Sequence, residues 1–124
     1  MTFDAFEVNK PLDQLQSKDQ YTTVLRVRLC KTEEVADGEV RKVETAGLVL
    51  AVYHVGSEFF VTDDACTHGP GSLSEGFLEC DVIECNFHQG RFNVRTGAVV
   101  LPPCTIPIKT YKTIVEEGAV QIEL

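Results

Sequence analysis

The chain lacks any apolar run long enough to cross a membrane. A transmembrane helix needs about 20 consecutive apolar residues, and no stretch of the 124 residues approaches that length. The first seven residues, Met1–Glu7, also lack the basic start and apolar run of a signal peptide. These absences exclude a membrane-spanning protein and predict a cytoplasmic one.

Basic residues are scarce as well. Eleven Lys and Arg stand against nineteen Asp and Glu, for a net charge of −8. Such an acidic chain does not favour nucleic acid or anionic membrane as a partner. It suits solubility and docking to proteins with basic patches. The length and the 44% hydrophobic content indicate one domain with one ordinary core.

A disulfide framework and long helices are also missing. The five cysteines are an odd number without regular spacing, so metal binding explains them better than disulfides do. No segment has the pattern of a helix of three turns or more. What the chain has instead is a series of short apolar or alternating segments separated by turn residues, at about 24–29, 40–43, 47–55, 59–61, 108–115 and 119–124.

These segments predict an all-β fold, a small antiparallel β barrel or sandwich. The run 47–55 and the segment 59–61 predict a hairpin with one strand buried on both faces, and a turn at Glu117-Gly118 joins the last two strands. Residues 63–103 are rich in glycine and proline and predict a loop-rich insertion. Residues 1–21 are mixed and polar, so we expect an N-terminal extension before a domain at 22–124.

Two cysteine–histidine motifs lie inside this insertion. Cys66-Thr67-His68 and Cys85-Asn86-Phe87-His88 are separated by sixteen residues, and glycine follows each closely. Each loop supplies one thiolate and one imidazole, so the four side chains match a Rieske 2Fe–2S cluster, in which two histidines replace two cysteines on one iron. We therefore predict Cys66, His68, Cys85 and His88 as ligands of one such cluster.

This ligand set has a direct consequence for redox chemistry. Two ferric ions, two sulfides and two thiolates sum to zero charge, whereas four thiolates would leave the cluster at −2. Adding an electron to a neutral cluster costs less electrostatic work. Histidine ligation therefore raises the potential to about −150 to +300 mV, against about −400 mV for plant-type ferredoxins.

Zinc is the main alternative, because it also accepts two cysteines and two histidines. Zinc fingers usually group like ligands around a hairpin and a helix, whereas each loop here is mixed and no helix follows. The other cysteines, Cys30, Cys80 and Cys104, are interpreted as structural or incidental. His54 lies in a predicted strand away from the motifs and is interpreted as an ordinary half-exposed residue.

Residues 22–124 resemble the Rieske-type ferredoxins of bacterial aromatic-ring-hydroxylating, non-haem iron oxygenase systems. The resemblance rests on the two ligand motifs, the second within the run 83–92, and on four further runs, Gly76-Phe77-Leu78-Glu79, Thr96-Gly97, Leu101-Pro102-Pro103-Cys104-Thr105 and Ile108-Lys109-Thr110-Tyr111. It implies that the two cysteines hold an inner iron and the two histidines an outer, more exposed one. It also implies that a third loop near Pro102 and Pro103 covers the cluster.

The chain departs from the Rieske proteins of respiratory cytochrome complexes. Those have a disulfide between the cluster loops, where Gly71 and Phe87 stand here. They also have serine and tyrosine hydroxyls at the positions of Gly90 and Phe92, so we expect a potential toward the low end of the Rieske range. Asn86 stands where many relatives carry proline.

The resemblance implies a one-electron shuttle and not a catalyst. Its partners would be a flavin-dependent NAD(P)H reductase and a terminal Rieske non-haem iron oxygenase, and a monomer is expected because one small face must serve both. A small Rieske-like subunit of an assimilatory nitrite reductase is the alternative. A truncated oxygenase is disfavoured, since 124 residues leave no room for a mononuclear iron domain.

Overall fold

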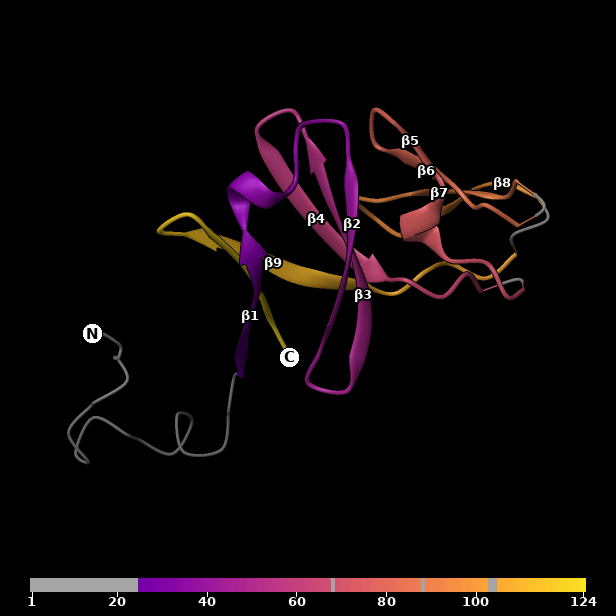
Figure 1. Cartoon of the computed structure of the whole chain (residues 1–124). Coiled ribbons are helices and arrows are strands. Elements are labelled where there is room, and N and C mark those ends of the chain that lie inside the picture. Colours follow the sequence, from indigo (N-terminus) through magenta and orange to yellow (C-terminus); the bar gives the residue numbers. More distant parts are fainter. Residues whose placement is uncertain (1–24, 68, 88, 103–104) are drawn as a thin grey trace.

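The larger of two antiparallel sheets forms a nearly closed barrel. A computed structural model describes residues 25–67, 69–87, 89–102 and 105–124. The barrel strands follow the order β1-β10-β9-β4-β3-β2, and β1 also contacts β2, so the two edges of the sheet approach each other (Figure 1). Their bounds are β1 Arg26–Lys31, β2 Val40–Thr45, β3 Leu48–Val55, β4 Glu58–Asp63, β9 Thr110–Glu116 and β10 Ala119–Glu123.

A second, smaller sheet lies beside the barrel and forms the other end of the molecule in Figure 1. It has the order β5-β6-β7-β8. Two short 3-10 turns complete the described elements, η2 Thr32–Glu34 after β1 and η3 Leu73–Glu75 before β5. The four strands are β5 Phe77–Glu79, β6 Val82–Glu84, β7 Arg91–Asn93 and β8 Val99–Leu101. All of them fall within residues 63–103, the segment predicted as an insertion.

The predicted all-β class and antiparallel barrel are confirmed. The hairpin over residues 47–61 forms from β3 and β4, and Leu50 to Tyr53 are all buried, which is the strand predicted to be covered on both faces. The described residues contain no helix long and apolar enough to cross a membrane. The N-terminal extension predicted at residues 1–21 lies outside the described residues.

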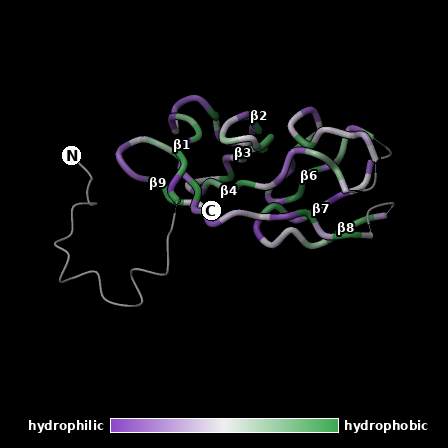
Figure 2. The backbone as a smooth tube through the Cα atoms, turned by 90° about the horizontal axis from the view of Figure 1, so that it is seen from below, coloured by the Kyte–Doolittle hydropathy of each residue, from purple (hydrophilic) through white to green (hydrophobic). Residues whose placement is uncertain are grey.

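The apolar residues gather in two clusters, which Figure 2 shows as hydrophobic segments in both parts of the molecule. One fills the barrel and includes Leu50, Val61 and Ile122. The other lies between the barrel and the second sheet and includes Tyr53 and Phe92. Because β3 contributes alternate residues to both clusters, the smaller sheet is packed directly on the barrel wall and not hinged from it.

Candidate metal centre

The first cysteine motif forms a loop that closes on itself at its base. We call residues 65–72 loop 1. It begins and ends at a bridge between Ala65 and Ser72, and the Cys66 N–H donates to the Gly71 carbonyl at 3.0 Å. Cys66 lies at the base of loop 1, so this hydrogen bond holds its backbone in place. The Cys66 side chain is buried. The first motif is therefore anchored at its thiol end.

The second motif repeats this arrangement in the β6–β7 hairpin. We call residues 85–90 loop 2. The Cys85 N–H donates to the Gly90 carbonyl at 2.7 Å, which spans five residues as the Cys66–Gly71 bond does. Cys85 is 1% exposed and follows directly after β6. The two loops are thus closed by hydrogen bonds of the same sequence separation, and each loop has its cysteine at the base.

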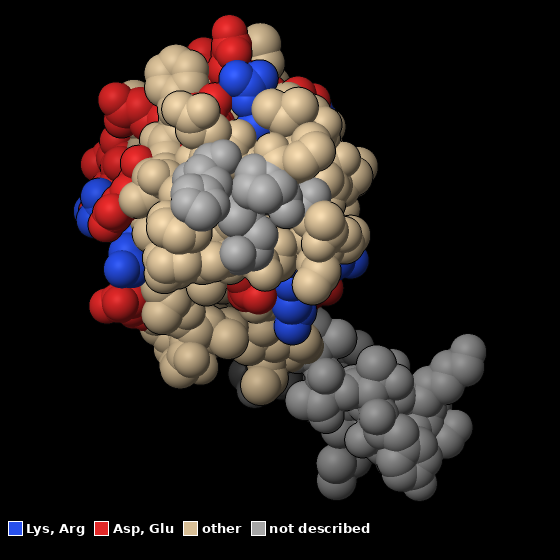
Figure 3. Space-filling model, turned by 90° about the vertical axis from the view of Figure 1, so that its right-hand side faces the viewer, with Lys and Arg blue, Asp and Glu red and all other residues tan. Residues whose placement is uncertain are grey.

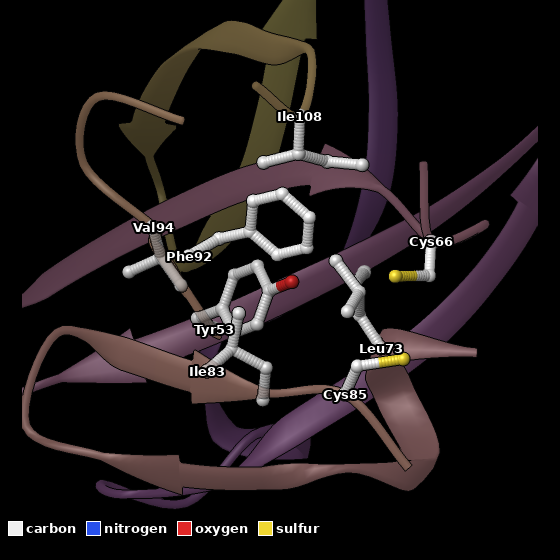
Figure 4. Packing of buried hydrophobic residues seen from close by; sticks show 9 residues of the cluster. Tyr53, Cys66, Leu73, Ile83, Cys85, Phe92, Val94 and Ile108 are labelled. Carbon is white, nitrogen blue, oxygen red and sulfur yellow. The ribbon is translucent and has the colours of Figure 1, made fainter. Parts of the chain in front are cut away.

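The two cysteine side chains meet. The Cys66 and Cys85 thiols are in hydrogen-bonding contact, and Figure 4 shows their sulfur atoms beside Leu73 at one edge of the second apolar cluster. Burial raises the pKa of the Cys85 thiol to about 11, opposed by the Phe87 N–H, which donates to Cys85 Sγ at 3.3 Å and favours the thiolate. A metal that binds here must therefore displace a proton from a buried sulfur.

Glycine is required where the loops touch. A Cβ placed on Gly71 would lie 2.3 Å from Cys85 Sγ and 2.9 Å from Phe87 Cβ. A Cβ on Gly69 would lie 2.6 Å from the Phe87 ring. These distances are far below van der Waals contact, so only residues without a side chain allow loop 1 to approach loop 2 this closely.

A buried carboxylate holds the base of loop 1. Asp64, 3% exposed, accepts from Ser72 Oγ at 2.5 Å and from the Ser74 N–H at 2.8 Å. It thereby joins the end of β4 to the η3 turn on the far side of the loop. The two consecutive acids Asp63-Asp64 carry no sequence signal of this role, because acidic residues near a strand end are usually solvated.

A third segment also lies against loop 1. Thr67 Oγ1 donates to the Ile106 carbonyl at 2.7 Å, which places the chain after β8 beside the first motif. The resemblance implies a covering loop in this region. Pro102 is exposed directly after β8, whereas Pro103 and Cys104 lie outside the described residues.

The structure therefore places half of the predicted ligand set. Cys66 and Cys85 come together, and His68 and His88 lie outside the described residues. Of the other candidates, Cys30 is buried in the barrel core, as interpreted, and Cys80 is an exposed free thiol. His54 is half-buried, contacts the Val35 carbonyl at 2.7 Å through Nδ1 and stacks on Phe59, away from the motifs.

The described side chains fit an iron–sulfur cluster. Two buried thiols in contact, a backbone N–H directed at one of them, and close glycine-rich loops are the features that thiolate ligation needs. The model of the Rieske [2Fe-2S] domain matches residues 26–112, well over half of the chain. The chain belongs to the Rieske [2Fe–2S] domain family.

Relatives of this Rieske domain include two ferredoxins at more than 40% identity. Ferredoxin CarAc of Metapseudomonas resinovorans is 46% identical over 97 residues, which cover 77% of this chain and 91% of that protein. The ferredoxin component of the p-cumate 2,3-dioxygenase system of Pseudomonas putida is 44% identical over 100 residues, which cover 79% and 85%.

Solved structures agree with the fold. A ferredoxin of Sphingomonas yanoikuyae B1 superimposes with a TM-score of 0.77 at 46% identity, covering 81% of this chain and 99% of that one. A complex of oxygenase and ferredoxin in carbazole 1,9a-dioxygenase contains a chain with a TM-score of 0.75, also at 46% identity, covering 78% and 91%. The family carries one Rieske-type 2Fe–2S cluster.

The contact at Gly71 gives a testable prediction. In Gly71→Ala, the new methyl group collides with Cys85 Sγ, so the purified protein should carry less than about a tenth of the wild-type iron and acid-labile sulfide. Gly47→Ala is the matched control, because Gly47 has a φ of +76° but nothing within 4 Å of its Cβ position. Its backbone strain should cost about 1 kcal/mol and leave the cluster content unchanged. Equal iron contents in the two variants would contradict the close approach.

Proposed function

We propose that this Rieske domain is a one-electron carrier that takes electrons from a flavin-dependent NAD(P)H reductase and delivers them to a terminal aromatic-ring-hydroxylating oxygenase. The proposal is carried by the meeting of Cys66 and Cys85 across two matched loops at one end of the molecule. Support comes from relatives named as ferredoxin components of dioxygenase systems, and from a similar ferredoxin in complex with its oxygenase.

We propose Cys66, His68, Cys85 and His88 as the four ligands. The two thiols supply the inner pair, and the family resemblance assigns the two imidazoles to the outer iron. When bound, the cluster supplies a centre that gains and loses a single electron. The chain's part is to orient the thiolates through their loop closures, and to direct the Phe87 N–H at Cys85 Sγ, which stabilises negative charge on that sulfur.

The face that carries these loops suits brief docking. Figure 3 views that end, where the described side chains around the centre are almost all uncharged and acidic side chains gather along one side. Leu101, the last residue of β8, is 44% exposed, and Ile106, in the segment that lies against loop 1, is 59% exposed. We propose that this small apolar surface meets each partner in turn, and that the protein acts as a monomer with His68 and His88 as the point of electron exit.

No observation favours either alternative function, the small subunit of a nitrite reductase or the zinc-stabilised module. A structure named for a nitrite reductase small subunit has a TM-score of 0.68 but is only 16% identical, so it shows a shared fold alone. A zinc-stabilised module is disfavoured by membership of a family that carries a 2Fe–2S cluster. Among the described residues, no group of three or more His, Cys, Asp and Glu side chains is placed to hold a metal ion.

The proposed function has a direct test. Protein purified without air should contain two irons and two acid-labile sulfides per chain and, after reduction with dithionite, give the EPR signal of a mixed nitrogen and sulfur 2Fe–2S centre. It should then pass electrons from an NAD(P)H-dependent flavoprotein reductase to a Rieske oxygenase in a reconstituted assay. One zinc and no sulfide would contradict the cofactor, whereas a cluster that no such reductase reduces would contradict the proposed partners.

Exchanging an imidazole for a thiolate tests the role of the histidines. In His68→Cys or His88→Cys, the cluster gains one negative charge, so its reduction potential should fall by about 100 mV or more if a cluster assembles. His54→Cys is the matched control, because His54 contacts Val35 and Phe59 in the barrel region. Its potential should stay within about 20 mV of the wild-type value. If the reduction potential of His68→Cys or His88→Cys were unchanged, the histidine replaced in that variant would not be a cluster ligand.

A charge on the apolar face tests the docking surface. In Ile106→Asp, a carboxylate must be desolvated on docking, so the oxygenase's apparent KM for this protein should rise about tenfold. Leu25→Asp is the control, because Leu25 is also 59% exposed but precedes β1 at the opposite end of the molecule. Equal effects of the two substitutions would place docking elsewhere.

A further inference from the structure

Asn86 makes two polar contacts from loop 2 to the chain of loop 1 and η3. Its Oδ1 accepts from the Ser72 N–H at 2.8 Å, and its Nδ2 donates to Glu75 Oε1 at 3.3 Å. The same Oδ1 lies 3.9 Å from Cys85 Sγ. The residue directly after one cysteine thus contacts the segment that follows the other. We call this pair of hydrogen bonds the Asn86 bridge.

The bridge continues into the interior of the protein. Ser72, whose N–H Asn86 binds, donates its own hydroxyl to Asp64, the buried carboxylate at the base of loop 1. A continuous series of hydrogen bonds therefore runs from loop 2, through Ser72, to the end of β4. An exposed side chain beside one thiol is in this way fixed to a buried group at the base of the other loop.

We propose that Asn86 is a positioning residue that fastens the two cysteine loops together without a covalent bond and sets how tightly the cluster is retained. This inference rests on the ligand set proposed above. Gly69 and Gly71 have no side chains, so they contribute no side-chain hydrogen bond where loop 1 packs against loop 2. Directional hydrogen bonds are the natural means to fix the separation of two such surfaces.

The bridge needs an amide for a chemical reason. Position 86 must accept from a backbone N–H and also donate to a carboxylate, and a side-chain amide has both an acceptor and a donor. The substitution Asn86→Asp would keep the acceptor but turn a second carboxylate oxygen toward Glu75. Alanine would leave the Ser72 N–H and the Glu75 carboxylate to water.

The first experiment compares two asparagines of the same region. The rate of cluster loss from the oxidised holoprotein is followed by bleaching of its visible absorbance in excess EDTA. In Asn86→Ala the rate should rise about threefold to tenfold, as expected for the loss of one net hydrogen bond. Asn93→Ala is the matched control, because Asn93 Oδ1 accepts from the Arg95 and Thr96 N–H groups and so closes a local turn without joining the loops. Its rate should stay within about twofold of the wild-type rate.

A reversal of donor and acceptor separates the bridge from a general folding effect. Asn86→Asp alone should lose the cluster faster than wild type, and Glu75→Gln alone should behave like wild type because the amide oxygen still accepts. Combining Asn86→Asp with Glu75→Gln keeps the net charge at −8 and lets the glutamine amide donate to the new carboxylate. This double variant should recover a rate within about twofold of wild type.

The reduction potential of the double variant gives an independent reading. One negative charge moves from position 75 to position 86, directly beside Cys85, so the potential should fall while the rate of cluster loss recovers. Equal rates for Asn86→Ala and Asn93→Ala, or a double variant as labile as Asn86→Asp, would overturn the inference. A wild-type protein without a cluster would overturn the ligand set and, with it, this inference.

Discussion

The structure depends on the close approach of two backbone loops across Gly71. Two thiols can serve one small inorganic core only if the loops that carry them come within a few ångströms of each other, and a Cβ at position 71 would lie 2.3 Å from Cys85 Sγ. The backbone conformations of both loops allow this close approach. Both loops close at their bases through a hydrogen bond from the cysteine N–H, so the sulfur positions follow from the backbone.

The barrel gives this arrangement a rigid base. The strand β3 contributes to both apolar clusters, and the second cluster contains Cys66 and Cys85 together with Tyr53 and Phe92. The thiols are thus packed into a core and not displayed on a mobile loop. For an electron carrier this is an advantage, because a site that does not rearrange when its charge changes loses little energy to reorganisation.

Much of this architecture can be predicted from the sequence, because strands are encoded locally. The β3–β4 and β9–β10 hairpins follow from apolar runs separated by glycine-containing turns, and the structure has both. The strands β5 and β8 have no such signal, since three residues are too few to show an alternating pattern. The roles of Asp64 and Asn86 are equally hidden, because an acid beside a strand and an amide in a loop are ordinary on any surface.

The sequence by itself determined the chemistry and the fold class of this protein. Side-chain type decides which atoms can ligate iron, and period-two patterning decides which segments become strands, so both are encoded in neighbouring residues. Only the tertiary structure decided that Cys66 meets Cys85, that Gly71 lies between the loops, and that Asn86 reaches Ser72. These contacts join segments that are distant along the chain, and their geometry is set by how the second sheet packs on the barrel, which no local pattern records.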